Sequence, residues 1–344
     1  MLKNALKYWN RSMCDNMKRK NCGTPMKILF VGNFSIWMKL HLEHLIAGYR
    51  RAGFQVVTAD YHDMAKWHHI SLPQTFANEL RQRSLEKTVK REAPDICFFA
   101  GSIPFDLDRL KSYFNGLIVF HDYDGPRRRD MDFFAELSKK CMLLTVSGYV
   151  ERELKKRNCQ SFYLPHGVDT DFYHPDGGSP TSYPAEISFI GRATKRRVEI
   201  CEKTNLPIAL YGDRWKKTSL ASMCSYDENV YDRDVVSIYR DSAAMINILQ
   251  EPLNEYRTIL SLQCFAVPST ASCLCAEYVE EFPGSFEEGN EVLLFRDPAE
   301  LPELLKKITS DRKWATSIGE AGRKRCLAEH THFHRAQQFL DFIS

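Results

Sequence analysis

The sequence predicts an α/β protein with two Rossmann-like domains that face each other across a cleft. The chain has 344 residues, which is more than one hydrophobic core usually covers. Short apolar runs alternate with stretches of helical periodicity, and this alternation occurs in two separate blocks. Such alternation favours a parallel sheet with helices on both faces. Two sheets that face each other would leave a cleft at the carboxyl ends of their strands, where ligands bind in such folds.

The first block covers residues 26–175 and is expected to form the N-terminal domain. Each predicted strand is a short apolar run followed by a glycine, an acid or another polar residue, which is typical of buried parallel strands. The strands are predicted at residues 28–31, 54–59, 96–100, 117–120 and 142–146. Helices are predicted at residues 40–49, 75–91, 107–113 and 131–139.

The second block covers residues 176–325 and repeats the pattern as a C-terminal domain. Residues 176–184 are rich in glycine, proline and serine, so they are predicted to link the two domains. Strands are predicted at residues 186–190, 207–211, 244–248, 266–270 and 292–295, with helices between most of them. A further helical region is predicted from residue 302 onwards.

The composition is that of an ordinary globular protein. Apolar residues make up 44% and charged residues 26% of the chain, and the net charge of +3 is too small to indicate nucleic-acid or membrane binding. No window approaches 18 consecutive apolar residues, so no transmembrane helix is predicted. The N-terminus lacks the continuous apolar core of a signal peptide, and a cytoplasmic location is expected. The 11 scattered cysteines are interpreted as reduced structural thiols, and no metal site is expected.

Residues 1–25 form a basic N-terminal extension. Its lysines and arginines far outnumber Asp15, its one acid, and its apolar residues recur at helical spacing. The simpler interpretation is a solvated helix packed on the first domain. The alternative is weak peripheral contact with an anionic membrane or a polyanionic acceptor.

The turn after the predicted strand 186–190 is a candidate phosphate site. Gly191 would let the backbone approach a ligand, and Arg192, Lys195 and Arg196 surround the start of the next helix. Cations normally favour the other end of a helix, so their position here favours a bound anion such as a diphosphate. The alternative is a solvated basic turn.

The turn after the predicted strand 207–211 could hold a nucleoside. Asp213 could accept hydrogen bonds from ribose hydroxyls, with Arg214 beside it, and Trp215 could stack on a base. The alternative is a surface ion pair beside a half-buried tryptophan.

The turn after the predicted strand 117–120 supplies the candidate catalytic residues. His121, Asp122 and Asp124 could serve as base, acid or electrostatic stabiliser at a transferring sugar. The alternative is an acidic turn that caps the next helix. The Asp-x-Asp pattern occurs five times in the chain, so it gives no support for metal binding.

A weaker candidate is the turn that holds Asn33 and Ser35. Contact with the acceptor and a plain turn between strand and helix are equally good interpretations of these residues. The turn lacks the G-x-G-x-x-G spacing of dinucleotide-binding folds. The chain also lacks a P-loop motif, which argues against a nucleoside triphosphatase.

Several motifs, in the expected order, together resemble one family of enzymes. Residues 164–169, Leu-Pro-His-Gly-Val-Asp, resemble the segment that joins the two domains of GT-B glycosyltransferases. Residues 287–295 resemble a late segment of the second domain of that group, glycosyl transferases group 1. Residues 321–336 and the Arg257-Thr258 pair are similar to the spore-maturation CgeB-like branch.

The resemblance implies a GT-B fold in which the second domain binds a nucleotide-diphosphate sugar, expected to be a UDP-sugar, and the first binds the acceptor. It implies that Arg192, Lys195 and Arg196 contact the diphosphate. It also implies no cofactor, no obligatory metal and retention of the anomeric configuration. A C-terminal helix within residues 326–344 would cross back to the first domain. The implied lining of the donor site is Asn254, Arg257 and Thr258.

One position departs from the family pattern. Where relatives place a glutamate that binds the donor ribose, this chain has Leu260, and Phe265 stands where a small residue is expected. Glu255 or Glu277 could substitute from another direction. Otherwise the donor differs, or activity has been lost.

Glycosyl transfer is therefore the leading hypothesis. The acceptor is left open between a glycan, a lipid-linked sugar, a protein and a modified nucleic acid. One alternative is a non-catalytic nucleotide-sugar-binding protein on the same scaffold. Another is a nucleotide-sugar epimerase or phosphorylase that shares the fold and acts without a separate acceptor.

Overall fold

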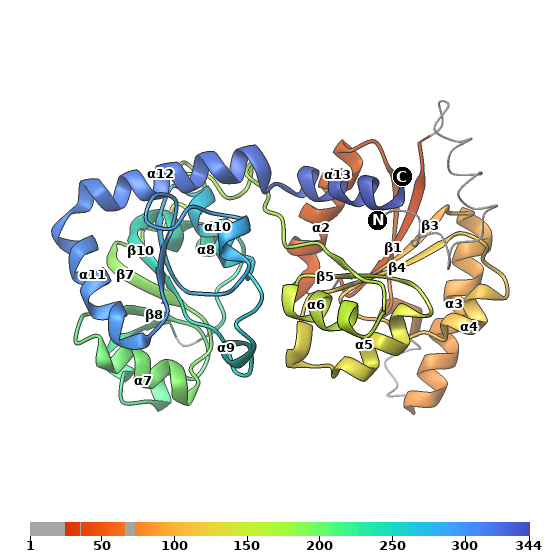
Figure 1. Ribbon diagram of the computed structural model, residues 1–344, viewed down its shortest axis with the longest axis horizontal. Coiled ribbons are helices and arrows are strands. Elements are labelled where there is room, and N and C mark those ends of the chain that lie inside the picture. The colour runs from red at the N-terminus through yellow and green to blue at the C-terminus, as the bar shows by residue number, and fades with distance from the viewer. Residues whose placement is uncertain (1–24, 35, 66–72, 227) are drawn as a thin grey trace. The chain divides into compact units, whose positions relative to one another are not determined.

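The computed structural model describes residues 25–344 except 35, 66–72 and 227, and these residues form two α/β units (Figure 1). The first unit consists of Met1–Pro165 with His332–Ser344, and the second of His166–Thr331. Each unit holds one six-stranded sheet in the described part of the chain, and every pair of neighbouring strands is parallel. The predicted two-domain α/β fold is confirmed.

The first sheet has the strand order β2-β1-β3-β4-β5-β6. Its central strands β3 and β4 are buried on both faces, as their apolar sequences predict. The strand bounds are β1 Lys27–Gly32, β2 Gln55–Asp60, β3 Ile96–Ala100, β4 Leu117–Asp122, β5 Met142–Thr145 and β6 Phe162–Tyr163.

Helices cover both faces of this sheet. On one face, Phe30 and Phe98 pack with residues of α2 and α13, including Phe339. On the other, Phe99 and Phe120 pack with residues of α3 to α6. The helices are α2 Ile36–Arg51, α3 Gln74–Glu92, α4 Leu107–Lys111, α5 Met131–Ser138, α6 Gly148–Lys156 and α13 His332–Ile343, with short 3-10 turns η2 Asp63–Ala65 and η3 Gly125–Arg127.

The second sheet has the order β12-β11-β10-β7-β8-β9. Numbered within the unit and read from β9, this is 3-2-1-4-5-6, the order of a Rossmann fold. From β7 to β9, successive strands are added towards one edge of the sheet, and from β10 to β12 they are added towards the other edge. The strand order therefore reverses between β7 and β10. The strand bounds are β7 Ala185–Ile190, β8 Ala209–Tyr211, β9 Cys224–Tyr226, β10 Ser242–Asn247, β11 Cys273–Glu277 and β12 Leu293–Phe295.

Two apolar clusters cover the faces of the second sheet, and α12 contributes to both. One cluster contains residues of α7 and α11, and the other contains residues of α8 and α10. The helices are α7 Lys195–Lys203, α8 Asp232–Asp241, α9 Leu253–Tyr256, α10 Gln263–Ser269, α11 Leu301–Ser310 and α12 Arg312–Glu329. The 3-10 turns are η4 Trp215–Lys217, η5 Ala221–Met223, η6 Phe282–Gly284 and η7 Pro298–Glu300.

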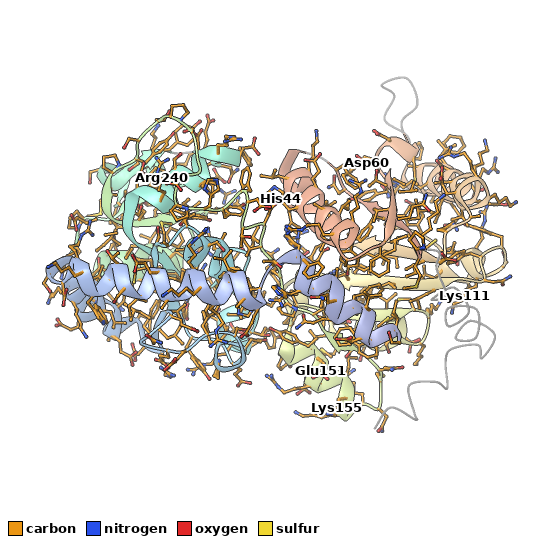
Figure 2. All side chains as sticks on the ribbon, turned by 90° about the horizontal axis from the view of Figure 1, so that it is seen from above. His44, Asp60, Lys111, Glu151, Lys155 and Arg240 are labelled. Atoms are coloured by element: carbon orange, nitrogen blue, oxygen red, sulfur yellow. The ribbon has the colours of Figure 1, made fainter. Side chains whose placement is uncertain are left out.

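The predicted linker, residues 176–184, is bound to the second unit. Arg240 of α8, labelled in Figure 2, donates to the carbonyl oxygen of Gly177 at 2.7 Å. The N–H of Tyr183 donates to Asp241 at 2.8 Å. The preceding residues belong to the same unit, because the N–H of Val168 donates to the carbonyl oxygen of His330 at 2.9 Å. The chain consequently enters the second unit at His166, ten residues before the expected start at 176.

One predicted strand is wrong. Residues 266–270 lie in or just after α10, and the strand that follows is β11, Cys273–Glu277. All residues of α10 from Cys264 onwards are buried, so the helix shows no polar face in the sequence. A short segment that is buried on all sides can be a strand or a helix, and periodicity does not distinguish them. The short edge strands β6 and β9 were also not predicted.

The chain leaves the second unit after Thr331 and ends as α13 in the first unit. Gly48 of α2 lies against the start of this helix, because a Cβ at Gly48 would come within 2.5 Å of His332. The helix then packs its buried face, including Phe339, into the same cluster as Tyr49. No helix among the described residues is long and apolar enough to cross a membrane. The N-terminal extension up to residue 24 lies outside the described residues.

Candidate functional site

The carboxyl edge of the second sheet gathers the predicted donor-site residues. Strands β7 and β10 are neighbours there, and the chain continues from β7 towards β8 but from β10 towards β11. Ligands of open parallel sheets bind at such a reversal. The predicted residues follow three strands of this edge: Gly191, Arg192, Lys195 and Arg196 after β7, Asp213 and Arg214 after β8, and Asn254, Arg257 and Thr258 after β10.

Helix α7 begins at this edge with three consecutive cations, residues 195–197. Thr194 caps the helix, and its Oγ1 accepts a hydrogen bond from the N–H of Arg197 at 3.4 Å. The first turn of the helix contains no acid. Because a helix N-terminus carries a partial positive charge, cations there are unfavourable until an anion joins them. The local charge therefore favours an anionic ligand.

Arg196 forms a two-bond ion pair with Glu277, the last residue of β11. Nη1 of Arg196 lies 3.0 Å from Oε2 of Glu277, and Nη2 donates to Oε1. Nη1 also donates to the carbonyl oxygen of Leu249 at 3.3 Å, and the Leu249 N–H donates to Oε2 of Glu277 at 3.0 Å. The structure thus makes Glu277, one of the two acids suggested as a ribose ligand, the partner of Arg196.

Arg197 binds a second carbonyl group of the loop after β10, that of Ile248. Its Nε and Nη2 donate to the oxygen of Ile248 at 3.2 and 2.8 Å, and its Nη1 donates to the oxygen of Arg192 at 3.1 Å. The guanidinium carbon lies 5.3 Å from the centre of the Phe189 ring. Burial lowers the pKa of Arg197 to about 10, so it stays charged at neutral pH. Arg197 is therefore a structural residue, which its place in a basic run did not reveal.

Asp213 bridges two cations of the predicted site. Its Oδ2 lies 3.2 Å from Nε of Arg192 and 3.4 Å from Nε of Arg214, and all three side chains are about half exposed. Ion pairs with this exposure contribute about 0–1 kcal/mol. An incoming phosphate could therefore replace Asp213 at little cost. Lys195 is more exposed still, and its nearest acid oxygen, on Glu199, is 3.9 Å away.

The predicted stacking role of Trp215 is wrong. Trp215 is fully buried, and its ring packs on Phe189 with centres 5.7 Å apart. Its Nε1 donates to the carbonyl oxygen of Gly191 at 2.8 Å. The residue is thus part of the core below the turn and presents no face to a base.

The segment after β10 contains two polar groups that form no hydrogen bond with the described residues. Arg257 is exposed, and no described residue forms a hydrogen bond or ion pair with its side chain. Oδ1 of Asn254 is buried without a hydrogen-bond partner among the described residues. Thr258 differs, because it is fully buried and its Oγ1 donates to Oε1 of Glu281 at 2.5 Å.

Leu260 does not line this edge either. It is 1% exposed and packs in the same apolar cluster as Phe265 and Val279. A glutamate at this position would need a polar partner in that cluster. The surroundings of residue 260 are therefore apolar and suit the leucine of this chain better than the glutamate of its relatives.

A pocket of about 460 Å³ lies beside the start of α7. One wall is α7 itself, and the other is the segment after β8. Cations and acids both line it, so its charge alone does not select a ligand. Its lining includes Lys195, Glu199, Glu202, Arg214 and Lys217.

A buried polar network at the ends of β7 and β10 was missed by the sequence-based prediction. Nδ2 of Asn247 donates to Oε1 of Gln263 at 2.8 Å, and Nε2 of Gln263 donates to the carbonyl oxygen of Ile190 at 3.0 Å. These bonds tie the two central strands together where they end. The available signal was a polar residue, Asn247, inside a run otherwise typical of a buried strand.

In the first unit, Asp122 is fully engaged by its own turn. Its Oδ1 lies 2.5 Å from Nη1 of Arg129, and its Oδ2 accepts the N–H of Gly125 at 2.7 Å. Arg129 also donates to the carbonyl oxygen of Gly101 at 2.9 Å. Burial raises the pKa of Asp122, and Arg129 and the Gly125 N–H oppose this effect. The carboxylate therefore holds the turns after β3 and β4 together.

His121 lies on the opposite face of the sheet from Asp122. Its ring contacts Phe98, in the cluster shared with α2 and α13, and Tyr123, at centre distances of 6.1 and 4.6 Å. Its Nε2 donates to the carbonyl oxygen of Leu164 at 3.0 Å. Burial lowers the pKa of His121 to about 3. The alternation of side chains along a strand thus separates the two residues that the sequence placed side by side.

Asp124 and Asn33 complete the first-unit candidates that the structure describes. Asp124 is ion-paired with Arg127 and lies 3.7 Å from Arg128. Asn33 follows β1 at the carboxyl edge and is partly buried. Ser35 lies outside the described residues.

The described cysteines are all free thiols, and most are buried. Burial raises the pKa of Cys201 and Cys273 to about 12, so these thiols are protonated at neutral pH. Within the described residues, no group of three or more His, Cys, Asp or Glu side chains is arranged to hold a metal ion.

Residues 189–341, which include most of the second unit, match the family model described as "Glycosyl transferase-like". No curated protein sequence matches the chain. Among solved structures, a glycosyltransferase from Rickettsia africae superposes with a TM-score of 0.69 at 14% identity, covering 93% of this chain and 98% of that one. The chain has the GT-B fold, and its residues 189–341 match a glycosyltransferase-like family.

Two further solved structures share this fold. HepE from Anabaena, solved with UDP and glucose, gives a TM-score of 0.64 at 13% identity, covering 92% of this chain and 98% of that one. A UDP-N-acetylglucosamine 2-epimerase gives 0.55 at 10% identity, covering 92% and 95%. The first of these proteins binds UDP, and the second is named for a UDP-sugar. At these identities the likeness shows the fold alone.

Proposed function

We propose that this protein is a glycosyltransferase that moves a sugar from a UDP-sugar to a hydroxyl acceptor, without a metal ion and with retention of the anomeric configuration. One observation carries the proposal: the cations at the start of α7 lie at the reversal point of a Rossmann-type sheet. A helix N-terminus in this position is suited to a diphosphate. The UDP in the HepE structure supports the choice of nucleotide.

The leaving diphosphate is the group that needs stabilisation in this reaction. Arg192, Lys195 and Arg257 provide exposed positive charge, and the N–H groups of the first turn of α7 provide donors. Fixed donors and charges aimed at developing negative charge are the usual source of such stabilisation. Cations in this arrangement can do the work that Mg²⁺ does in other transferases.

In the first unit, we assign Asp122 and Asp124 to shaping the acceptor-side turn. Both carboxylates are held by arginines, so neither is poised as a general base. In a retaining reaction an oxygen of the leaving diphosphate can take the acceptor proton instead.

A catalytic role for His121, Asp122 or Asp124 stays a prediction, as does a cytoplasmic location. The acceptor stays open between a glycan, a lipid-linked sugar, a protein and a modified nucleic acid.

A second candidate is a nucleotide-sugar-binding protein that has lost activity. The observation in its favour is Leu260, which fills the position of the family's ribose-binding glutamate and is buried in the core. A third is an epimerase, because a UDP-N-acetylglucosamine 2-epimerase shares the fold.

Thermal unfolding with a panel of nucleoside diphosphates and their sugars tests the proposal. A ligand at a hundred times its Kd raises the free energy of unfolding by about 2.7 kcal/mol. We expect UDP and one UDP-sugar to stabilise the protein. UDP release from that sugar should accelerate when a hydroxyl acceptor is added.

The alternatives give different results in the same assay. A binding protein would be stabilised but would release no UDP with any acceptor, and an epimerase would convert the sugar without an acceptor. If no nucleotide in the panel stabilises the protein, the proposed function is wrong.

A further inference from the structure

The Arg196–Glu277 ion pair crosses the carboxyl end of β10, the strand that lies between β7 and β11 in the sheet. Arg196 follows β7, Glu277 ends β11, and β10 lies between these strands in the sheet. The two side chains also hold both backbone groups of Leu249, the second residue after β10: Arg196 donates to its carbonyl oxygen, and Glu277 accepts its N–H. The guanidinium is therefore fixed in place at the reversal point of the sheet.

The hydrogen bonds occupy one edge of the Arg196 guanidinium and leave another. An arginine has five N–H donors. The two terminal nitrogens bind Glu277, and Nη1 also binds Leu249. The Nε–H and the second N–H of Nη2 have no hydrogen-bond partner among the described residues. These two donors lie side by side on one edge of the plane, and that edge can bind two oxygens of a phosphate.

The side chain of Arg196 is 20% exposed, so part of it is accessible to a ligand. The pairing with Glu277 cancels the charge of Arg196. What remains is a pair of donors with a fixed direction, and exposed cations nearby supply the net positive charge. An arginine that is already ordered loses less rotational freedom when it binds a ligand.

We propose that Glu277 is a positioning residue for the donor diphosphate: it holds Arg196 by its Nη1–Nη2 edge so that the adjacent Nε–Nη2 edge binds a phosphate of the nucleotide. The inference rests on the proposed function, because it assumes a diphosphate at this edge of the sheet. It gives Glu277 a role that does not require contact with the sugar or the ribose.

The test is calorimetric titration of the full chain with UDP and, separately, with uridine. The variants are Glu277→Gln, Arg196→Gln, the two combined, and Arg196→Lys. Loss of a hydrogen bond to a charged group corresponds to about a tenfold to hundredfold loss of affinity. We expect Glu277→Gln and Arg196→Gln each to weaken UDP by such a factor and to leave uridine unchanged.

The combined variant should bind UDP no more weakly than Arg196→Gln alone, because Glu277 acts through Arg196. Arg196→Lys keeps the charge but lacks the planar fork, so it should also lose UDP affinity. Equal losses of UDP and uridine affinity in Glu277→Gln would show a purely structural role and overturn the inference. So would wild-type UDP affinity in Glu277→Gln or in Arg196→Lys.

Glu291→Gln is the matched control. Glu291 accepts hydrogen bonds from Arg325 at 3.0 and 3.1 Å and from the N–H of Glu287 at 2.7 Å, so it also joins an arginine to a backbone group. Its side chain is 11% exposed, against 9% for Glu277. We expect the two variants to unfold at similarly lowered temperatures, with UDP affinity reduced only in Glu277→Gln.

The same experiment separates failure of the inference from failure of the proposed function. If the wild-type protein does not bind UDP, the proposed function fails and the inference with it. If wild-type protein binds UDP and only Arg196→Gln weakens it, the diphosphate site stands and the role of Glu277 is wrong.

Discussion

The carbonyl oxygen of Gly191 lies only 2.4 Å from the position that a Cβ on Gly212 would occupy. The turns after β7 and β8 are therefore in direct backbone contact. The same carbonyl accepts the indole N–H of Trp215 at 2.8 Å, and the N–H of Gly191 donates to the oxygen of Tyr211 at 2.8 Å. Arg192 and Asp213 directly follow these glycines, so this contact sets their separation.

We expect Gly212→Ala to destabilise the protein by about 1–3 kcal/mol or more, because the new methyl group would overlap backbone and the φ of +125° is unfavourable for alanine. Urea unfolding measures the effect. Gly284→Ala is the control, since a Cβ there meets nothing within 4 Å, and it should stay within about 0.5 kcal/mol. Equal stability of the two variants would show that the turns can separate freely.

Substitution of Arg257 should weaken UDP binding without lowering the stability of the protein. Its side chain is exposed and forms no hydrogen bond or ion pair with the described residues, so Arg257→Ala should change the free energy of unfolding by about 0.5 kcal/mol at most. UDP affinity should fall about tenfold, because a cation near the diphosphate is lost. Lys313→Ala, an exposed cation on α12, should change neither quantity. Unchanged UDP affinity in Arg257→Ala would remove this residue from the donor site.

Asp122→Asn tests whether this carboxylate is structural. The substitution leaves Arg129, which is 17% exposed, without its ion-pair partner, and such a loss costs about 3–5 kcal/mol. We expect this loss of stability in urea unfolding, with little change in turnover per folded molecule. Asp132→Asn, whose side chain is 89% exposed, should stay within about 0.5 kcal/mol. A stable but inactive Asp122→Asn would instead favour a catalytic role.

Chelation tests metal independence. Because cations and the start of α7 are proposed to meet the diphosphate, UDP release should be the same with excess EDTA as with added Mg²⁺ or Mn²⁺. The assay compares initial rates after dialysis against the chelator. A rate that falls with EDTA and returns with Mn²⁺ would contradict the proposal.

The strand-turn-helix order and the edge that bears the site could be predicted because both follow from local patterns. Apolar runs predicted most strands, and the rule for parallel sheets directed attention to the turns after β7 and β8, whereas the family resemblance implied the residues after β10. The failures required information on tertiary contacts. Residues 266–270 are a buried helix because they pack against other elements, and Trp215 is buried for the same reason. Nor could spacing show that Arg196 pairs with Glu277, 81 residues away.

His121 provides a prediction of how stability depends on pH. Its side chain is 2% exposed, and its pKa is lowered from 6.5 to about 3 by burial. Between these two values the unfolded chain binds a proton that the folded chain does not. The contribution of His121 to stability is therefore present above pH 6.5 and is lost as the pH falls towards 3, by at most about 1.4 kcal/mol per pH unit.

His121→Gln should remove this dependence while keeping an N–H donor for the carbonyl oxygen of Leu164. The variant should be less stable than wild type at pH 7, and its free energy of unfolding should fall less steeply between pH 6.5 and 4.5. Urea unfolding at half-unit steps of pH measures the slope, which is about 1.4 kcal/mol per pH unit for each proton taken up on unfolding. His62→Gln, at an exposed position, is the control and should keep the wild-type slope. If His121→Gln also keeps it, another buried group, such as His41, accounts for the proton uptake.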